Sequence, residues 1–179
     1  MVILIFLLIL LLGTLIAAVF SINALIQTLH TGLPYVTTPP WAIDWMVQNL
    51  MVREHDVVVE LGCGDARVLV ALARRFPRAR FLGIEIQWWP YLFAKWRTRK
   101  LRNIKIARGD LYRYDLSPAH LVYGFYITKF MDRLEVKLKG ELLPGTKVIS
   151  YGFKFSHWQP IQEIPNPRGE GSTLLIYER

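Results

Sequence analysis

VVVELGCGDAR, residues 57–67, decides the fold of this 179-residue chain. Its first five residues predict a buried strand, and Gly62 and Gly64 predict a tight turn where the backbone comes close to a ligand. Apolar residues recur at helical spacing after the turn, which indicates a helix that begins near Asp65. A strand, a glycine turn and a helix N-terminus in succession are typical of sites for nucleotides and nucleotide-like cofactors.

Strands and helices alternate along the rest of the chain. This alternation predicts a doubly wound, mainly parallel, Rossmann-like α/β sheet with helices on both faces. Strands are predicted at residues 56–61, 80–85, 104–107, 121–126, 147–153 and 173–177, and helices at 41–51, 65–76, 88–101 and 129–139. In the helix at 88–101 we expect the large apolar residues to face the core and the basic residues to face solvent; the apolar residues are Trp88, Leu92, Phe93 and Trp96.

The N-terminal segment is apolar and uncharged. Residues 1–43 contain no Asp, Glu, Lys or Arg, and residues 1–20 are apolar apart from Gly13 and Thr14. About 20 such residues in a helix cover the ~30 Å hydrocarbon core of a bilayer, so we predict a transmembrane anchor in residues 1–28. A cleaved signal peptide is the competing interpretation, but the segment lacks a basic start and its apolar run exceeds the usual h-region.

Charge predicts the orientation of the anchor. All 22 Lys and Arg residues follow it, which favours a cytoplasmic C-terminal domain and an external N-terminus. Cys63 is the single cysteine, so an internal disulfide is excluded. We expect a prokaryotic inner membrane because no Arg-rich transit peptide is present, while a mitochondrial inner membrane stays open.

A basic segment carries much of the net charge of +8. Three interpretations stay open for it: contact with an anionic membrane surface, a solvated helix face, or binding to the phosphates of nucleic acid. A membrane surface is favoured because the anchor would hold the domain at a bilayer, and nucleic acid is the least favoured partner. The basic residues are Lys95, Arg97, Arg99, Lys100, Arg102, Lys105 and Arg108.

A proline-containing segment, residues 29–54, separates the anchor from the predicted domain at 55–179. Its three prolines between residues 34 and 40 exclude a helix there and favour an extended path. Tyr35 and Thr38 could therefore lie over the turn after the first strand and act as a cofactor lid. Thr38 is also in position to cap the helix predicted at 41–51.

Acidic residues at the strand ends discriminate between cofactors. Glu85 lies 23 residues after Gly62, near the distance at which an acid binds ribose hydroxyls. Arg67 stands where a dinucleotide site needs a third small residue, which argues against NAD. Glu60 and Asp110 suit an amine and an exocyclic amino group better than a pyrophosphate, so the pattern favours S-adenosylmethionine.

These motifs resemble those of a known superfamily. Residues 60–65 look like motif I of the class I S-adenosylmethionine-dependent methyltransferases, and residues 109–111 look like their adenine-contacting motif. The resemblance implies that Glu60, Gly62 and Gly64 hold the methionine end of the cofactor, Glu85 the ribose and Asp110 the adenine. For Glu60 and Asp110, a helix cap or a turn is the alternative role.

A closer resemblance, to the membrane-anchored protein lysine methyltransferases, covers nearly the whole chain. Known mitochondrial members of that family methylate the ATP synthase c-subunit and the adenine nucleotide translocase. Two departures are Ala66, where glycine is common, and the short chain, which leaves little room for a helix between the last two strands. The resemblance rests on the apolar N-terminus and on residues 34–39, 64–67, 155–158 and 169–171.

The resemblance implies in-line attack by a neutral lysine amine on the sulfonium methyl group, with no dedicated base required. Tyr126, His157 and Trp158 are the candidate catalytic residues around that methyl group. His157 is the one candidate proton acceptor, and a structural role is its alternative. The histidines stand far apart in the sequence and one cysteine completes no ligand set, so we predict no metal site.

The predicted activity is methylation of a lysine in a membrane protein substrate. Methylation of a membrane lipid or quinone stays open, because the anchor and the aromatic residues would serve it equally well. A tethered cofactor-binding scaffold without enzymatic activity is a third hypothesis.

Overall fold

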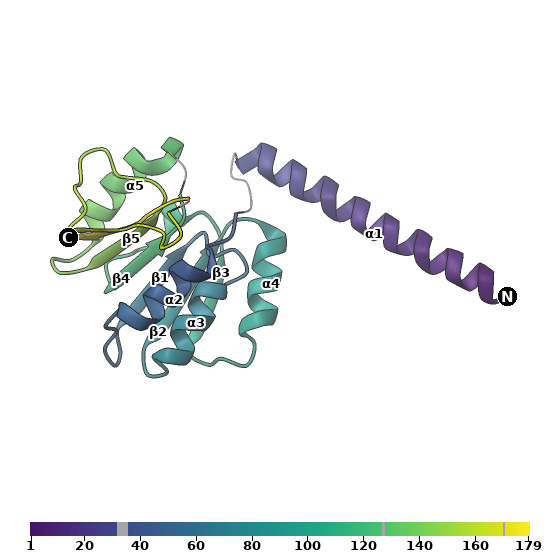
Figure 1. Ribbon diagram of the computed structural model, residues 1–179, viewed down its shortest axis with the longest axis horizontal. Helices are drawn as coiled ribbons and strands as arrows, with labels where there is room; N and C mark the ends of the chain where they lie inside the picture. Colours follow the sequence, from purple (N-terminus) through teal and green to yellow (C-terminus); the bar gives the residue numbers. More distant parts are fainter. Residues whose placement is uncertain (32–35, 127, 170) are drawn as a thin grey trace. The chain divides into compact units, whose positions relative to one another are not determined.

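A computed structural model of the protein describes residues 1–31, 36–126, 128–169 and 171–179 (Figure 1). Tyr35, a predicted lid residue, lies outside the described residues. The chain forms two compact units, Met1–Val36 and Thr37–Arg179.

The first unit is one long helix, α1 (Val2–Thr31). Its first 22 residues, Val2–Asn23, are long and apolar enough to cross a membrane by length and composition, and none of that stretch is buried. A signal sequence would meet the same criterion. The predicted helix is therefore present, and its membrane insertion stays a prediction.

The second unit is built on a seven-stranded sheet with the order β3-β2-β1-β4-β5-β7-β6. The first five strands in the chain pair in parallel, while β7 runs antiparallel to both of its neighbours. This confirms the predicted mainly parallel sheet. The strands are β1 (Val57–Leu61), β2 (Arg80–Glu85), β3 (Ile104–Arg108), β4 (Leu121–Gly124), β5 (Lys147–Tyr151), β6 (Gln162–Ile164) and β7 (Leu174–Glu178).

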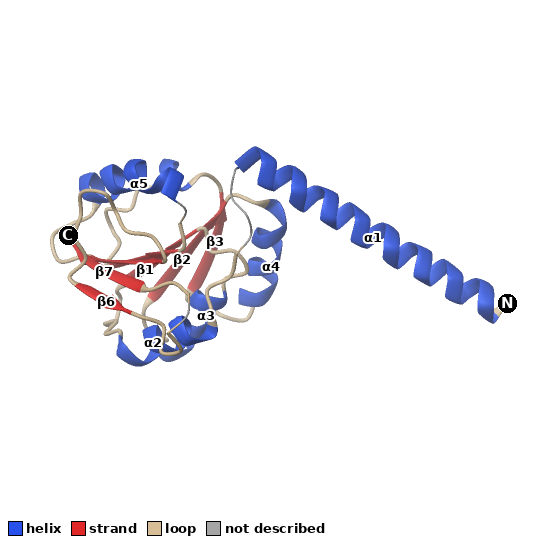
Figure 2. Ribbon diagram, turned by 45° about the horizontal axis from the view of Figure 1, so that its top comes forward, coloured by secondary structure: helices blue, strands red, loops and turns tan. Residues whose placement is uncertain are grey.

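Helices cover both faces of this sheet (Figure 2). The helices α2 (Pro40–Asn49), α3 (Arg67–Arg75) and α4 (Trp88–Thr98) contribute to one buried apolar cluster, with Val58 and Leu121 of the sheet. On the other face, α5 (Thr128–Glu141) packs over a second cluster that includes Val59 and Val122. Adjacent residues of β1 and β4 alternate between the two clusters, as the two-residue period of a strand requires.

The prediction for α4 was wrong in its orientation. Its buried residues are the small ones, Pro90, Ala94 and Thr98, and the Thr98 hydroxyl donates to the Ala94 carbonyl at 2.7 Å. Small side chains let the helix lie close to the sheet, so the large apolar side chains point outward. The four exposed apolar residues of the helix are Trp88, Leu92, Phe93 and Trp96.

Two further expectations needed correction. Thr38 does not cap α2, because Pro39 occupies the N-cap position and makes no side-chain cap bond. Strand β6 was missed, because its three residues form an exposed edge strand and show no apolar pattern. The structure has no helix between β5 and β7 among the described residues, as the short chain predicted.

Candidate active site

The turn after β1 carries three residues with left-handed backbone. Gly62 has φ +71°, Gly64 has φ +53° and Ala66, just before α3, has φ +60°. The N–H groups of Gly62 and Cys63 both donate to the Ile84 carbonyl, at 2.8 and 3.1 Å, which ties the turn to the end of β2. A Cβ added to Gly62 would meet no atom within 4 Å. The backbone at Gly62 is therefore open to an approaching ligand.

Glu60 is a buried carboxylate with an unpartnered oxygen. The residue is 4% exposed, and its Oε2 receives no hydrogen bond from the described part of the chain. Burial raises the pKa of Glu60 well above its ordinary value, although a backbone hydrogen bond from Leu69 opposes the shift. A buried carboxylate oxygen without a donor is costly to maintain in a folded protein. This position is suited to a ligand that brings a positively charged donor.

Glu85 ends β2 on the other side of the same turn. One oxygen accepts from the Gly64 N–H at 2.8 Å, and the other accepts from the Gln87 N–H, also at 2.8 Å. Burial raises its pKa, while these two hydrogen bonds lower it. Each carboxylate oxygen has a second lone pair, so Glu85 can position the turn and still accept from a diol.

Asp65 is held by two arginines. Arg67 Nη2 lies 2.9 Å from Asp65 Oδ2, and Arg97 Nη2 from α4 lies 2.8 Å from the same oxygen. Although burial would raise the pKa of Asp65, the hydrogen bonds and charges of the two guanidinium groups lower it. The pair of ion contacts joins the turn to α4 and fixes the start of α3.

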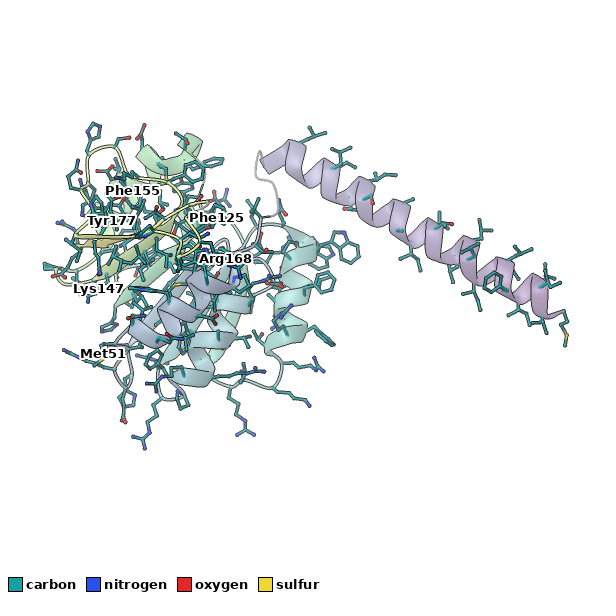
Figure 3. All side chains as sticks on the ribbon, in the orientation of Figure 1. Met51, Phe125, Lys147, Phe155, Arg168 and Tyr177 are labelled. Atoms are coloured by element: carbon teal, nitrogen blue, oxygen red, sulfur yellow. The ribbon has the colours of Figure 1, made fainter. Side chains whose placement is uncertain are left out.

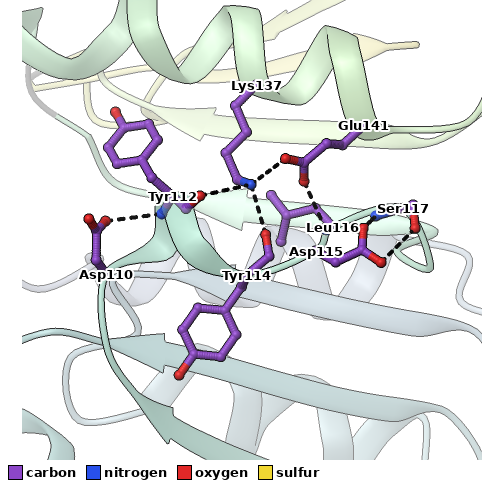
Figure 4. A network of polar contacts seen from close by, with 8 residues as sticks. All are labelled: Asp110, Tyr112, Tyr114, Asp115, Leu116, Ser117, Lys137 and Glu141. Carbon is purple, nitrogen blue, oxygen red and sulfur yellow. Dashed lines mark hydrogen bonds and ion pairs between the residues drawn. The ribbon is translucent and has the colours of Figure 1, made fainter.

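The loop after β3 is held by α5 (Figure 4). Asp110 caps the short 3₁₀ helix η1 (Leu111–Arg113), with its Oδ1 accepting from the Tyr112 N–H at 3.0 Å. Lys137 Nζ donates to the Tyr114 carbonyl at 2.7 Å and to Glu141 Oε1 at 2.5 Å. The alternative role of Asp110 as a turn residue is thus present in the structure, and its adenine contact stays a prediction.

Tyr126 lies beyond the end of β4, at the same edge of the sheet. Its ring folds back over Gly124, where an added Cβ would lie 2.0 Å from the hydroxyl oxygen. The hydroxyl is buried and has no hydrogen-bond partner among the described residues. Burial, followed by the charges of Tyr123 and Glu60, raises the pKa of Tyr126 well above its ordinary value. Tyr126 therefore brings a second unsatisfied polar atom to the region of Glu60.

Tyr123, which was not among the predicted site residues, pairs in register with Glu60 across β1 and β4. Its hydroxyl lies 2.5 Å from the Thr38 hydroxyl, so Thr38 reaches the sheet next to Glu60. The alternation of β4 would have indicated Tyr123, because it places that residue and Glu60 on one face. The contact is consistent with the predicted position of Thr38 near the cofactor turn.

An aromatic wall formed by Trp41, Phe125 and Tyr151 borders this region. Phe125 meets Tyr151 edge-on at 4.9 Å between ring centroids, and Trp41 of α2 lies 5.9 Å from Tyr151. Phe125 is labelled in Figure 3. The Trp41 Nε1 is buried and makes no hydrogen bond with the described residues. Trp41, Phe125 and Tyr151 come from three separate segments, so no local pattern connects them.

The structure places His157 and Trp158 against α5 and the core. The His157 N–H donates to Glu135 Oε2 at 2.9 Å, while its carbonyl accepts from Lys139 Nζ at 2.8 Å. Trp158 is 9% exposed and stacks on Phe155 at 5.5 Å. The two contacts of His157 are made by its main chain and the residue is exposed, so its catalytic role and its structural alternative both stay predictions.

The residues at the turn fit S-adenosylmethionine. The free Oε2 of Glu60 suits the amino group of the methionine part, the open side of Gly62 admits its chain, and Glu85 can accept from the ribose. Across the described residues, no group of three or more His, Cys, Asp and Glu side chains could hold a metal ion. The absence of a metal site stays a prediction.

This sheet order, the acid before a glycine turn and the second acid at the end of β2 define a class I S-adenosylmethionine-dependent methyltransferase. A sequence profile of the ANTKMT methyltransferase domain matches residues 60–162. The chain belongs to this family.

Relatives agree with this assignment. A protein-lysine N-methyltransferase of Saccharolobus islandicus is 33% identical over 156 residues, which cover 81% of this chain and 92% of the relative. The lysine N-methyltransferase of the ATP synthase c-subunit from Rattus norvegicus is 30% identical over 82% of this chain, which spans 66% of that relative. A crystal structure of an RNA methyltransferase from Salinibacter ruber with S-adenosyl-L-homocysteine has a TM-score of 0.73 and 30% identity, covering 80% of this chain and 93% of that one.

Proposed function

We propose that this methyltransferase acts on the side-chain amine of a lysine in a membrane protein and that α1 anchors it in the bilayer. The observation that carries the proposal is the set of buried, unsatisfied polar atoms on Glu60 and Tyr126, near the ends of β1 and β4, and on Trp41, whose ring lies 5.9 Å from that of Tyr151 at the end of β5. Its relatives from Saccharolobus islandicus and Rattus norvegicus are both named as lysine methyltransferases, which supports an amine as the acceptor.

The site must deliver the lysine amine in its neutral form. A free lysine has a pKa near 10.4, so it is protonated in water at neutral pH. Removal from water by the rings of Trp41, Phe125 and Tyr151 would lower that pKa. The unsatisfied Tyr126 hydroxyl could then accept from or donate to the incoming amine. S-adenosylmethionine supplies the activated methyl group.

Glu60 would orient the cofactor rather than take the proton. Its buried oxygen is satisfied when it accepts from the amino group of the methionine part, and this fixes the direction of the sulfonium. Because methyl transfer needs nitrogen, carbon and sulfur in line, most of the rate enhancement would come from such positioning. The aromatic faces also favour the methylammonium product.

Membrane attachment is the second part of the proposal. Its support is the apolar stretch Val2–Asn23 and the absence of Asp, Glu, Lys and Arg before Asp44. All Lys and Arg residues follow that stretch, which favours a domain on the cytoplasmic side, in a prokaryotic inner membrane. An anchored domain would meet lysines of membrane proteins close to the bilayer surface.

The test is transfer of tritium from labelled cofactor to membranes of cells that lack the gene. We expect label on a membrane protein, at a lysine identified by mass spectrometry, and loss of that label with Glu60→Gln. Label that extracts into organic solvent would contradict the proposal and assign the enzyme to a lipid or quinone. Carbonate extraction of the full chain checks the anchor separately, because an integral protein stays in the pellet.

One observation favours a second candidate, methyl transfer to RNA. The Salinibacter ruber structure is named an RNA methyltransferase, and the basic segment of this chain could hold phosphates. Treating the labelled product with ribonuclease or with protease separates the two candidates. Ribonuclease-sensitive label would overturn the lysine proposal.

A further inference from the structure

The outer side of α4 is an apolar surface on a helix whose inner side is already packed. Leu92 is 37% exposed, Phe93 49% and Trp96 63%. Large side chains stand outward from this helix in Figure 3. A soluble helix usually buries such residues and exposes polar ones. The reversed pattern marks a surface that meets something apolar.

Cations are interleaved with these apolar residues. The Arg99 guanidinium lies 4.4 Å from the centre of the Trp96 ring, and Lys95 and Lys100 are exposed on the same stretch. No Asp or Glu occurs between Glu85 and Asp110, while seven Lys and Arg do. The surface therefore combines a tryptophan, two further apolar side chains and a purely positive charge. We call Leu92, Phe93, Lys95, Trp96 and Arg99 the α4 outer face.

We infer that the α4 outer face docks on the headgroup region of an anionic lipid bilayer. Tryptophan prefers the boundary between headgroups and acyl chains, where its ring is half apolar and its N–H finds a partner. Lysines and arginines beside it are attracted to anionic lipids. The aliphatic Leu92 side chain, in the middle of the face, gains nothing from the phosphates of a nucleic acid but gains from acyl chains.

This inference rests on the proposed membrane anchor and deepens it. Five residues, 32–36, separate α1 from the second unit, so an anchored domain would face the bilayer at a high effective concentration. A weak lipid contact would then be enough to orient the domain. Arg97, on the same helix, binds Asp65 of the cofactor turn at 2.8 Å, so docking would hold the active site at a fixed height above the membrane.

The experiment is hydroxyl-radical footprinting of the full chain in vesicles of phosphatidylcholine, with or without phosphatidylglycerol. We expect oxidation of Trp96 to be several-fold slower in the anionic vesicles. Met51, which is 92% exposed and outside the α4 outer face, serves as the internal control and should be oxidised equally in both. Raising the salt concentration should remove much of the protection, because the attraction is electrostatic.

Two matched variants test the face itself. Trp96→Asp should abolish the protection of Phe93 in anionic vesicles, whereas Val136→Asp, at a 74% exposed position on α5, should leave it intact. Binding of S-adenosylmethionine to both variants, measured by calorimetry, shows that they are folded. Loss of protection in both variants alike would contradict the assignment to α4.

The remaining outcomes separate this inference from the proposed function. A protein that floats with vesicles but shows equal Trp96 oxidation in both lipids would retain its anchor and overturn the docking face. A protein that fails to float would overturn both. Protection that appears only after a membrane protein or RNA is added would assign the face to that partner and overturn the lipid assignment.

Discussion

The turn after β1 and the segment after β5, residues 152–158, satisfy their polar groups differently. At the first, Glu60 Oε2 is buried without a partner in the described part of the chain. In the second, the Phe155 N–H donates to Tyr177, the His157 N–H to Glu135 and the Ser156 hydroxyl to Asp132. Because buried polar groups are normally satisfied, we interpret the turn, with its unpartnered Glu60 oxygen, as prepared for a ligand, and we predict that the segment after β5 serves the scaffold.

The aromatic residues of the two regions also differ in whether their contacts are complete. Trp158 packs against Phe155 and Tyr177, whose ring centroids lie 5.5 and 5.4 Å from its own, and all three residues are buried. Trp41, whose ring lies 5.9 Å from that of Tyr151, keeps a buried N–H without a partner among the described residues. Four predictions test this contrast between ligand site and scaffold.

The largest effect is expected from Trp158→Ala. The substitution removes a buried ring that packs against two others and should lower the free energy of unfolding by about 3–5 kcal/mol. Chemical denaturation measures this change, and kcat per folded molecule should stay near the wild-type value. His157→Asn is the milder control and should change both quantities little. A fall in kcat at unchanged stability would instead place Trp158 in the active site.

The next effect is expected from Glu60→Gln. Losing the charged acceptor for the cofactor amino group should lower kcat/KM on the order of a hundredfold. This factor corresponds to a loss of about 2–3 kcal/mol of transition-state stabilisation. Stability should not fall, because the variant removes the charge of a buried carboxylate whose Oε2 has no partner among the described residues. Initial rates with labelled cofactor and a thermal unfolding curve provide the two readouts. Glu163→Gln, at an exposed position, is the control and should affect neither.

Gly62→Ala should have two effects that can be measured separately: a loss of stability from backbone strain and a loss of cofactor affinity from the added Cβ. Because φ of Gly62 is +71°, a backbone conformation that alanine disfavours, the substitution should lower the free energy of unfolding by about 1 kcal/mol. Its Cβ would also enter the open side of the turn, so affinity for S-adenosylmethionine should fall as well. Gly145→Ala is the matched control, because φ is +86° and an added Cβ there also meets no atom within 4 Å. Equal affinities in the two variants, by calorimetry, would show that Gly62 does not face the cofactor.

The smallest effect is a pH dependence caused by Glu60. Burial raises its pKa above 4.5, so between 4.5 and the raised value the folded protein without ligand binds more protons than the unfolded chain. Its stability should therefore decrease as the pH rises through that window, and Glu60→Gln should lack this slope. The cofactor amino group favours the ionised form, so cofactor affinity should increase with pH over the same range. An affinity that decreases with pH there would contradict the pairing.

Much of the site was predictable because its elements are local in the sequence. Glu60, Gly62 and Gly64 lie within five residues, and Glu85 ends the next strand, so a strand pattern and a turn pattern were enough to find them. The sheet followed from the alternation of apolar runs and helical periods. The membrane-spanning length of α1 was equally visible, because it depends only on length and composition.

Two properties were not predictable in this way: which side of a helix faces the core, and which buried polar groups find a hydrogen-bond partner. The large apolar residues of α4 were predicted to face the core, but they face solvent. Helical spacing identifies an apolar stripe on a helix but does not show whether another element covers that stripe. Trp41, Phe125 and Tyr151 form a wall only because three distant segments fold together. Whether His157 and Trp158 support the fold or face the ligand depended on Glu135, Lys139 and Tyr177, residues that lie 18 to 22 positions away from them in the chain.

The sequence by itself therefore determined the class of fold, the cofactor turn and the apolar N-terminal helix, since each depends on short-range spacing and composition. Only the tertiary structure decided which polar atoms stay unsatisfied and which apolar side chains stay exposed. Both properties depend on contacts between segments far apart in the chain, and these contacts exist only once the sheet and its helices have packed together.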